Sequence, residues 1–473
     1  MMARRLPQSS FSPLRRQAVM NRRFCLLCMV FGCAALVWLE RSIEAQIKRA
    51  STASLDHQKL IKEVESGQRS VANAQWWGFD PEDATECLQQ AINTGAKKVI
   101  VPYMNKEWIV RPIQLASNQT IVFEPGVIVT SKKGAFKGVH DCLFSASLQE
   151  NITLVGYGAT LRMRKQDYQS PDYLNAEWRM TLAFRSCDNV KILGLALRDS
   201  GGDGIYLGRS GGKRVSCRNI IIKDVVCDNH LRQGISVISV ENLLIENCRL
   251  MNTNGTPPSA GIDFEPNDAS ERLVDCVMRN CVIENNIGPG IHVYLNHLSD
   301  AGKTKPIGIL VENCLINGSQ AHGVGITNLM DTGPSGVIEF RNCVIQNTRA
   351  PGALISNTSS KAARVRFVNC KWYNTGQPGR TAPISIVAEE DEGKQVPRFP
   401  GGIEFVDCHV YQQQVQPVER NLAPVSTSGE NIEKYGLYEI HGNITVTGLA
   451  GGITFQKLAS KLSEVTLQVV PAK

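Results

Sequence analysis

The sequence lacks several patterns that mark common protein classes. No basic run with interleaved aromatic residues occurs among its 473 residues, so the chain shows no sign of a nucleic-acid interface. Its cysteines have no zinc-finger spacing with accompanying histidines, and no calcium-loop motif is present. Apolar residues at helical spacing are missing from the central part of the chain, which excludes helical repeats there.

An excess of positive charge is also missing once the first 45 residues are set aside. The whole chain carries a formal net charge of +7. Residues 1–45 hold seven Arg and two Glu, which leaves 44 basic and 42 acidic residues in the remainder. The body is therefore close to neutral, and charge alone favours neither a nucleic acid nor a polyanionic substrate.

The N-terminal segment combines arginines with one short apolar run. Six Arg lie between Arg4 and Arg23, and the apolar run extends over the 16 residues 24–39. Such a run is shorter than the roughly 20 residues that span a bilayer, so a cleaved signal peptide is favoured over a membrane anchor. Residues 1–45 are thus predicted to direct export and to make any membrane contact, and residues 46–75 to form a linker.

A four-residue phrase of glycine, an apolar residue, a variable residue and a second apolar residue recurs along the chain. Its copies start at Gly204, Gly234, Gly261 and Gly290, and weaker copies start at Gly323 and Gly352. Successive glycines are 30, 27, 29, 33 and 29 residues apart. This near-constant period is typical of structural units stacked in a solenoid.

A second phrase, Asn-Cys, keeps the same interval. It occurs at Asn247, Asn280, Asn313, Asn342 and Asn369. Between the phrases lie β-branched and aliphatic runs bounded by Gly, Asn and Pro, which predict two or three short strands per coil. Equivalent residues in stacked coils lie about 4.8 Å apart, so the Asn side chains can form an amide ladder while the cysteines fill the interior as unpaired thiols.

The chain resembles the right-handed parallel β-helix superfamily in these two recurring phrases, and the resemblance covers about residues 76–411. That superfamily includes pectin lyases, polygalacturonases and other polysaccharide-active enzymes. The resemblance implies an all-β fold: a single right-handed solenoid over residues 76–440, with the cap and first coils in 76–150 and a strand-rich closing segment in 441–473. A helix over about Asp83 to Thr94, signalled by Asp80 and Pro81, is expected to cap the first coil. The resemblance implies a carbohydrate partner, and we expect a monomer. The polygalacturonase sequence pattern is absent.

Polar residues gather on one predicted wall of this solenoid. The strand period of two directs the variable residue of each phrase outward, away from its two apolar neighbours. The variable position and its surroundings hold these candidates: Asp203, Tyr206, His230, Arg232, Ser236, Asp263, Glu265, Asp268, His292 and Tyr294. Acidic residues clustered with His and Arg indicate a functional site. The alternative interpretation is a network of ion pairs on the surface.

An insertion over residues 162–179 interrupts the coils and carries Tyr168, Tyr173 and Trp178. Aromatic side chains in a loop of this kind either stack on sugar rings or pack over the solenoid wall. The sequence favours neither role.

Three kinds of function fit these residues. In a glycoside hydrolase, Asp263 and Glu265, about 7 Å apart on one strand face, would be the acid and base, with Asp203 assisting. His230 and Arg232 would then orient the substrate, and Tyr206, Ser236, Asp268, His292 and Tyr294 would contact its sugars.

The second function is a polysaccharide lyase or uronate epimerase. It would use His230, His292 or Tyr294 as the base and Arg232 to neutralise the uronate. No cofactor is expected, although calcium held by the carboxylates is an alternative to Arg232. The third function is a wall that binds glycan without reaction.

Overall fold

The computed structural model describes residues 55–212, 214–298, 304–376, 381–390, 396–412, 423–448 and 462–472. The predicted signal segment and residues 46–54 of the predicted linker lie outside this part of the chain. The chain divides into two units between residues 60 and 61. Residues 55–60, the described part of the first unit, are helical. Within the described ranges, no helix combines the length and apolar character needed to cross a membrane.

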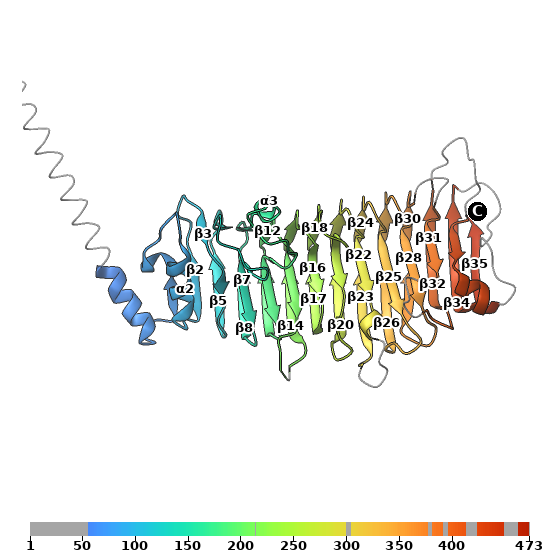
Figure 1. Cartoon of the computed structure of the whole chain (residues 1–473), viewed down its shortest axis with the longest axis horizontal. Coiled ribbons are helices and arrows are strands. Elements are labelled where there is room, and N and C mark those ends of the chain that lie inside the picture. The colour runs from blue at the N-terminus through green and yellow to red at the C-terminus, as the bar shows by residue number, and fades with distance from the viewer. Residues whose placement is uncertain are drawn as a thin grey trace, which may run out of the picture. The chain divides into compact units, whose positions relative to one another are not determined.

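The second unit is a stack of coils, and most coils contain three strands. One coil consists of β14 (Cys217–Lys223), β15 (Val226–Asp228) and β16 (Gln233–Val237). β14 and β15 belong to a large sheet, and β16 belongs to a sheet of 11 described strands. Each strand pairs in parallel with its equivalent in the next coil, as β16 does with β19 (Ala260–Phe264). The strands therefore follow one another along the length of the solenoid (Figure 1).

The remaining elements repeat this arrangement. The second sheet also contains β4 (Ile113–Gln114), β7 (Phe144–Ser147), β10 (Leu182–Arg185), β13 (Ile205–Gly208), β22 (Ile291–Tyr294), β25 (Val324–Leu329), β28 (Ala353–Thr358), β31 (Ile384–Val387) and β33 (Val425–Ser428). In addition to β14, the longer strands of the large sheet are β2 (Lys98–Val101), β5 (Gln119–Phe123), β8 (Glu150–Val155), β11 (Asp188–Leu193), β17 (Val240–Glu246), β20 (Leu273–Arg279), β23 (Ile307–Glu312), β26 (Gly336–Arg341), β29 (Arg364–Val368), β32 (Gly401–Tyr411), β34 (Leu437–Thr447) and β35 (Leu462–Pro471). β1 (Val71–Asn73) pairs with β2 at the start of this series. In addition to β15, the short strands of the large sheet are β3 (Trp108–Val110), β6 (Ile128–Ser131), β9 (Thr160–Arg162), β12 (Ala196–Arg198), β18 (Arg249–Met251), β21 (Val282–Glu284), β24 (Leu315–Asn317), β27 (Val344–Gln346) and β30 (Lys371–Tyr373). Residues 61–65 are helical, and the later helical elements are η1 (Ala74–Trp77), α2 (Thr85–Asn93), α3 (Lys165–Tyr168), η2 (Asn296–Leu298) and α4 (Glu430–Tyr435).

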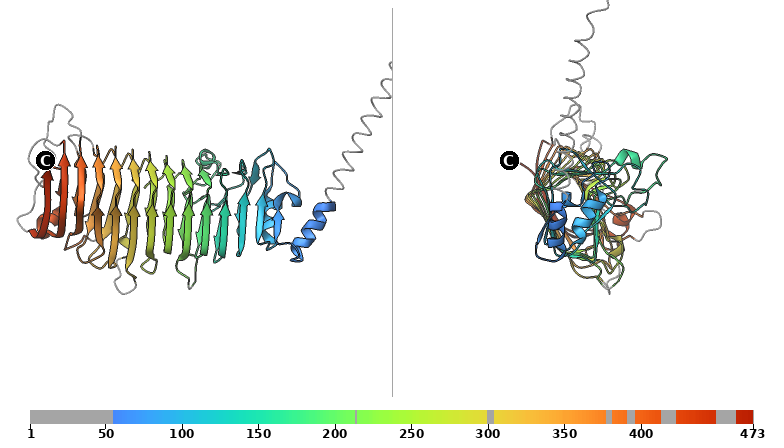
Figure 2. Two further views of the ribbon diagram at one scale, coloured as in Figure 1. Left: turned by 180° about the vertical axis from the view of Figure 1, so that it is seen from behind. Right: turned by 90° about the vertical axis from the view of Figure 1, so that its left-hand side faces the viewer.

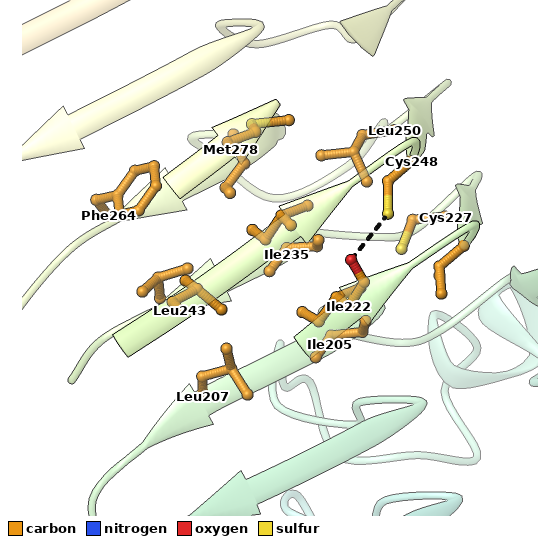
Figure 3. Close-up of a cluster of buried hydrophobic side chains, with 14 of the residues drawn as sticks. Ile205, Leu207, Ile222, Cys227, Ile235, Leu243, Cys248, Leu250, Phe264 and Met278 are labelled. Carbon is orange, nitrogen blue, oxygen red and sulfur yellow. Dashed lines mark hydrogen bonds between the residues drawn. The ribbon is translucent and has the colours of Figure 1, made fainter. Parts of the chain in front are cut away.

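The apolar residues of the glycine phrase form the interior, as predicted. Ile205 and Leu207 of β13 are fully buried, and Figure 3 shows them facing Ile222 and Leu243 of the large sheet. The glycines are required by the close stacking of coils. A Cβ atom on Gly234 would lie 2.4 Å from the carbonyl oxygen of Gly261, closer than a side chain tolerates.

The Asn-Cys phrase makes the corner between the long and short strands of a coil. Asn342 has a φ of 53°, a left-handed conformation that Asn adopts more readily than most residues. Its Nδ2 donates to Oδ1 of Asn313 at 3.2 Å, and Asn369 donates to Asn342 at 2.8 Å, which confirms the amide ladder at these coils. All 12 described cysteines are buried and free, so the prediction of unpaired thiols is also confirmed.

The N-terminal end is covered by α2, whose Leu88 and Ile92 are buried in the core. The end view in Figure 2 shows this helix across the coils. It begins later than Asp80 and Pro81 suggest, with Ala84 at the N-cap, because Asp80 accepts a hydrogen bond from Glu82 N in a preceding turn. The prediction of a capping helix over about Asp83 to Thr94 is correct, and the prediction that Asp80 and Pro81 mark its start is wrong.

The solenoid extends past the boundaries expected from the sequence at both ends. β1 lies inside the predicted linker and pairs in parallel with β2. At the other end, β32 pairs in parallel with β34, and β34 with β35. The described part of the predicted closing segment therefore continues the large sheet as further coils.

Candidate functional site

The variable residues of the glycine phrase form one column on the outer face of the second sheet. The strand register pairs Tyr206 with Ser236, Ser236 with Asp263, and Asp263 with His292. The column continues through Gly325 to Leu354. The sequence period therefore predicted correctly which of these residues stand side by side.

Arg232 lies among three carboxyl groups. Its Nη2 donates to Oε2 of Glu265 at 2.8 Å. Its Nε lies 3.7 Å from Oε1 of Glu177, and its Nη1 lies 3.9 Å from Oδ1 of Asp203. Burial lowers the pKa of Arg232, but the acids, Asp203 and Glu265 foremost, raise it above its ordinary value.

Two of these carboxyl groups keep their protons to unusually high pH. Asp203 is fully buried, and burial raises its pKa to about 7 against the opposing charge of Arg232. Burial likewise raises the pKa of Glu265 to about 7, and repulsion from Asp263 adds to the rise. A carboxyl group of this kind is protonated in a large fraction of molecules at neutral pH.

Asp263 is fully buried, and both of its carboxylate oxygens have partners. Oδ2 accepts from Nε2 of Gln233 at 2.9 Å, and Oδ1 lies 3.0 Å from Nδ1 of His292. Burial lowers the pKa of His292, but the hydrogen bond and charge of Asp263 outweigh it and raise that pKa overall. Asp263 is thus held in place to act on its neighbours, and the direct acid or base role predicted for it is not supported.

His230 lies inside the solenoid wall, which makes the prediction that it contacts substrate wrong. Its side chain is fully buried, and Nδ1 lies 2.8 Å from Oγ of Ser200. A Cβ atom on Gly204 would meet Nε2 at 2.6 Å, so the other ring nitrogen is covered by the chain. Burial lowers the pKa of His230 to about 3, which leaves the ring neutral.

Asp268 lines neither of the two clefts described below. It lies on the loop after β19, where Oδ1 is 3.3 Å from Nη1 of Arg209 and accepts from Ser270 N at 2.8 Å. Tyr294 does belong to the wall, with its ring centroid 6.2 Å from that of His292. The predicted sugar contact of Asp268 is therefore not supported, whereas that of Tyr294 stays a prediction.

Two clefts lie along this wall. The first cleft, of about 570 Å³, lies between the insertion and the wall, and its lining includes Glu177, Trp178, Tyr206, Arg232 and Glu265. The second cleft, of about 450 Å³, lies beyond His292 in the direction of the C-terminal coils. Its lining includes His292, His322, Gly325, Thr327 and Leu354. In the column of variable residues, His292 is the first residue that lines the second cleft.

Comparison with known proteins identifies the architecture. Residues 179–331 match the family model described as "right handed beta helix region". This chain is a right-handed parallel β-helix. A search of curated proteins gives no match.

Solved structures show the same fold at low identity. The A-module of the mannuronan C-5 epimerase AlgE6 from Azotobacter vinelandii has a TM-score of 0.60 and 13% identity, over 85% of this chain and 99% of that chain. The A-module of AlgE4 from the same organism has a TM-score of 0.56 and 13% identity, over 83% of this chain and 100% of that chain. A variant of the tailspike protein of E. coli bacteriophage HK620, solved with a pentasaccharide, has a TM-score of 0.55 and 11% identity, over 85% and 78% of the two chains.

The insertion over residues 162–179 is anchored to the β-helix by its aromatic residues. Tyr168 is buried, and its hydroxyl lies 2.8 Å from Oγ of Ser131. Tyr173 packs on Tyr168 with ring centroids 5.3 Å apart. Trp178, by contrast, is 40% exposed and lines the first cleft. Two of the three aromatic residues therefore pack over the wall, and one faces the open site.

Sequence reasoning missed three residues of the site. Glu177 comes from the insertion, which carries no repeat from which its position follows. Gln233 directly precedes the Gly234 phrase, and Nε2 of its side chain reaches the carboxylate of Asp263. His322 precedes the Gly323 phrase by one residue and lines the second cleft. A polar residue directly before the glycine phrase could therefore have identified Gln233 and His322 from the sequence.

Proposed function

We propose that this β-helix is a glycoside hydrolase with Glu265 as its general acid. The observation that carries the proposal is a partly exposed carboxyl group whose pKa is raised to about 7, in a cleft that also contains Trp178 and Tyr206. A general acid must still hold its proton near the working pH, and burial next to another acid achieves this. Aromatic rings suit the apolar faces of sugars.

For the second carboxylate we propose Glu177 in place of Asp263. Glu177 lines the same cleft, and its side chain is 28% exposed, whereas that of Asp263 is fully enclosed. Both carboxyl groups lie near the guanidinium group of Arg232, with Glu265 Oε2 2.8 Å from Nη2 and Glu177 Oε1 3.7 Å from Nε. Glycosidases flank the bond with carboxyl groups about 5 to 9.5 Å apart, and two partners of one guanidinium group are consistent with that range. Glu177 would then activate water, while Asp263 positions His292 and keeps Glu265 protonated.

A lyase or epimerase is the second candidate, and one observation favours it. The imidazole of His292 is hydrogen-bonded to the carboxylate of Asp263, and such a hydrogen bond orients an imidazole as a base. The likeness to epimerase A-modules adds only the fold. Arg232 already faces Asp203, Glu177 and Glu265, so a uronate carboxylate would depend on Arg185, the other cation that lines the first cleft.

Incubation of the purified protein with a panel of polysaccharides distinguishes the candidates. New reducing ends without ultraviolet absorbance from unsaturated sugars support hydrolysis. Reducing ends with that absorbance support a lyase. Altered uronate composition without cleavage supports an epimerase, and binding without any product supports a glycan-binding wall.

We also propose that the protein is exported and acts as a monomer. The arginines before residue 24 and the apolar run over residues 24–39 support export. N-terminal sequencing of protein recovered from outside the cytoplasm tests this, because a cleaved signal leaves a start near residue 46. Light scattering of the purified protein tests the monomer.

A further inference from the structure

We infer that the second cleft is a subsite for uncharged sugars, so that the substrate is an uncharged polysaccharide that lies along the wall across both clefts. This inference rests on the proposed hydrolase function for its account of cleavage. The second cleft itself takes no part in the acid and base roles argued above.

The position of the second cleft follows from the column of variable residues. The register runs from Asp263 to His292, then to Gly325 and Leu354. Residues of the first cleft stand earlier in the same column, beginning with Tyr206. Five coil steps separate Tyr206 from Leu354, which at about 4.8 Å per step is roughly 24 Å of wall. A chain of several sugars can therefore contact both clefts, with the acid between its ends.

The shape of the second cleft is fixed by close backbone contacts. A Cβ atom on Gly288 would lie 1.6 Å from the carbonyl oxygen of Pro258, so the two loops that form one side are in direct contact. On the floor, Gly325 has no side chain, and a Cβ atom there would meet only Cδ2 of His292, at 3.3 Å. The hollow is preformed, as is usual for small-molecule sites of about 300 to 1,000 Å³.

The lining of the second cleft is largely apolar and contains no Asp, Glu, Lys or Arg. Pro257, Pro258 and Leu354 contribute apolar surface, and Ile287 is 48% exposed although it is a large hydrophobic residue. The first cleft differs, because it contains Glu177, Arg185, Arg232 and Glu265. His292 also lines this cleft and has a raised pKa, but its imidazole is already paired with the carboxylate of Asp263. A uronate or sulfate group in the second cleft would therefore lose water without gaining an unpaired opposite charge, which is costly.

Two residues that line the second cleft each carry a polar atom without a hydrogen-bond partner among the described residues. These buried atoms are Nδ1 of His322 and Oγ1 of Thr327. Burial, together with the nearby His292, lowers the pKa of His322 to about 4, so its ring is neutral at physiological pH. Buried polar groups normally have partners, and sugar hydroxyls would supply them. The cleft thus combines an apolar surface with the neutral side chains of His322 and Thr327 and a His292 already paired with Asp263, which suits an uncharged sugar ring.

Binding to an inactive variant tests the inference without relying on turnover. Glu265→Gln protein is titrated calorimetrically with hexamers of glucose, xylose, mannose and N-acetylglucosamine, and with hexamers of galacturonate and mannuronate. We expect at least one uncharged hexamer to bind more than tenfold more tightly than either uronate hexamer. Tighter binding of a uronate hexamer, or no binding of any uncharged hexamer at millimolar concentration, overturns the inference.

A matched pair of variants locates the binding in the second cleft. Leu354→Asp, made in the Glu265→Gln protein, puts a carboxylate in the cleft, and we expect it to weaken binding of the preferred hexamer at least tenfold. Ser385→Asp adds the same charge one coil further along the column, outside the lining, and should change binding less than twofold. Equal effects of the two variants contradict the assignment. Should Glu265→Gln protein still release reducing ends, the hydrolase proposal fails, while the comparison of Leu354 with Ser385 still tests the cleft.

Discussion

Arg232 and Glu265 form the central contact of the site, with Nη2 and Oε2 2.8 Å apart across neighbouring coils. The contact favours the ionised form of Glu265, whereas burial and the nearby Asp263 favour the protonated form. These opposing effects leave its pKa near neutrality, where a carboxyl group can both donate a proton and recover one. The stacking of coils produces this balance, because it brings residues 33 positions apart in the sequence into contact.

Glu265→Gln should lower kcat by roughly 10²- to 10⁴-fold on any substrate that the parent cleaves, because an amide cannot donate a proton to the leaving oxygen. The fold should be retained, as judged by circular dichroism and thermal unfolding. Asp268→Asn is the control, because it changes an acid on the same loop that turns toward Arg209. Near-normal turnover of Glu265→Gln would exclude the general-acid role.

Arg232→Gln should move the alkaline limb of the pH profile of kcat/KM to higher pH. Glu265 is active as an acid only when protonated, so activity of the parent should fall as pH rises through about 7. Removing the cation removes the interaction that lowers the pKa of Glu265, so the proton is retained to higher pH. Arg209→Gln, at a surface ion pair, should leave the limb in place. An unchanged limb in Arg232→Gln, or a shift to lower pH, contradicts this assignment.

The periodic part of the site could be predicted from the sequence, because the coil repeat fixes both register and side-chain direction. This is why Tyr206, Ser236, Asp263 and His292 lie in one column as expected. The period of two applies only within a strand. His230 lies at the bend before β16, where that rule no longer holds, and its side chain turns inward.

The irregular part of the site depends on contacts that no repeat encodes. Glu177 reaches Arg232 because the insertion is pinned to the coils, in part by Lys165, whose Nζ donates to the carbonyl oxygen of His230 at 3.0 Å. The burial of Asp263 likewise could not be predicted from the sequence. An outward position on a strand is normally exposed, and here Gln233 and His292 enclose it.

Asp203 should make the folded protein less stable as pH rises. Its pKa is about 7 in the folded state against an ordinary value of 3.8, so the folded state holds a proton that the unfolded chain has lost. This contribution is fully present below about pH 4 and is lost as pH rises through about 7, with a slope of at most about 1.4 kcal/mol per pH unit. Urea unfolding of Asp203→Asn between pH 4 and 7 should show a smaller slope than the parent. An equal slope would mean that Asp203 titrates normally.

The coil cysteines should react as free thiols only after unfolding. All 12 described cysteines are buried and unpaired, and burial raises the pKa of Cys227 and Cys276 above the ordinary value. Native protein that starts near residue 46 should therefore react slowly with a thiol reagent, and denatured protein should give 12 thiols. A count well below 12 in denatured protein contradicts the unpaired arrangement.

Trp178 should contribute to substrate affinity more than to the chemical step. It lines the first cleft, where its ring centroid lies 5.2 Å from that of His140, while Arg232 and Glu265 contact each other in the same cleft. Trp178→Ala should therefore raise KM severalfold and leave kcat within about twofold, because stacking acts on the bound sugar in the ground state and the transition state alike. Leu174→Ala is the matched control, since Leu174 lies in the same insertion and is 68% exposed but does not line the cleft. If both variants leave KM unchanged, the ring does not contact substrate. If Trp178→Ala lowers kcat instead, its role is to hold Glu177, the neighbouring residue of the insertion, in position for the reaction.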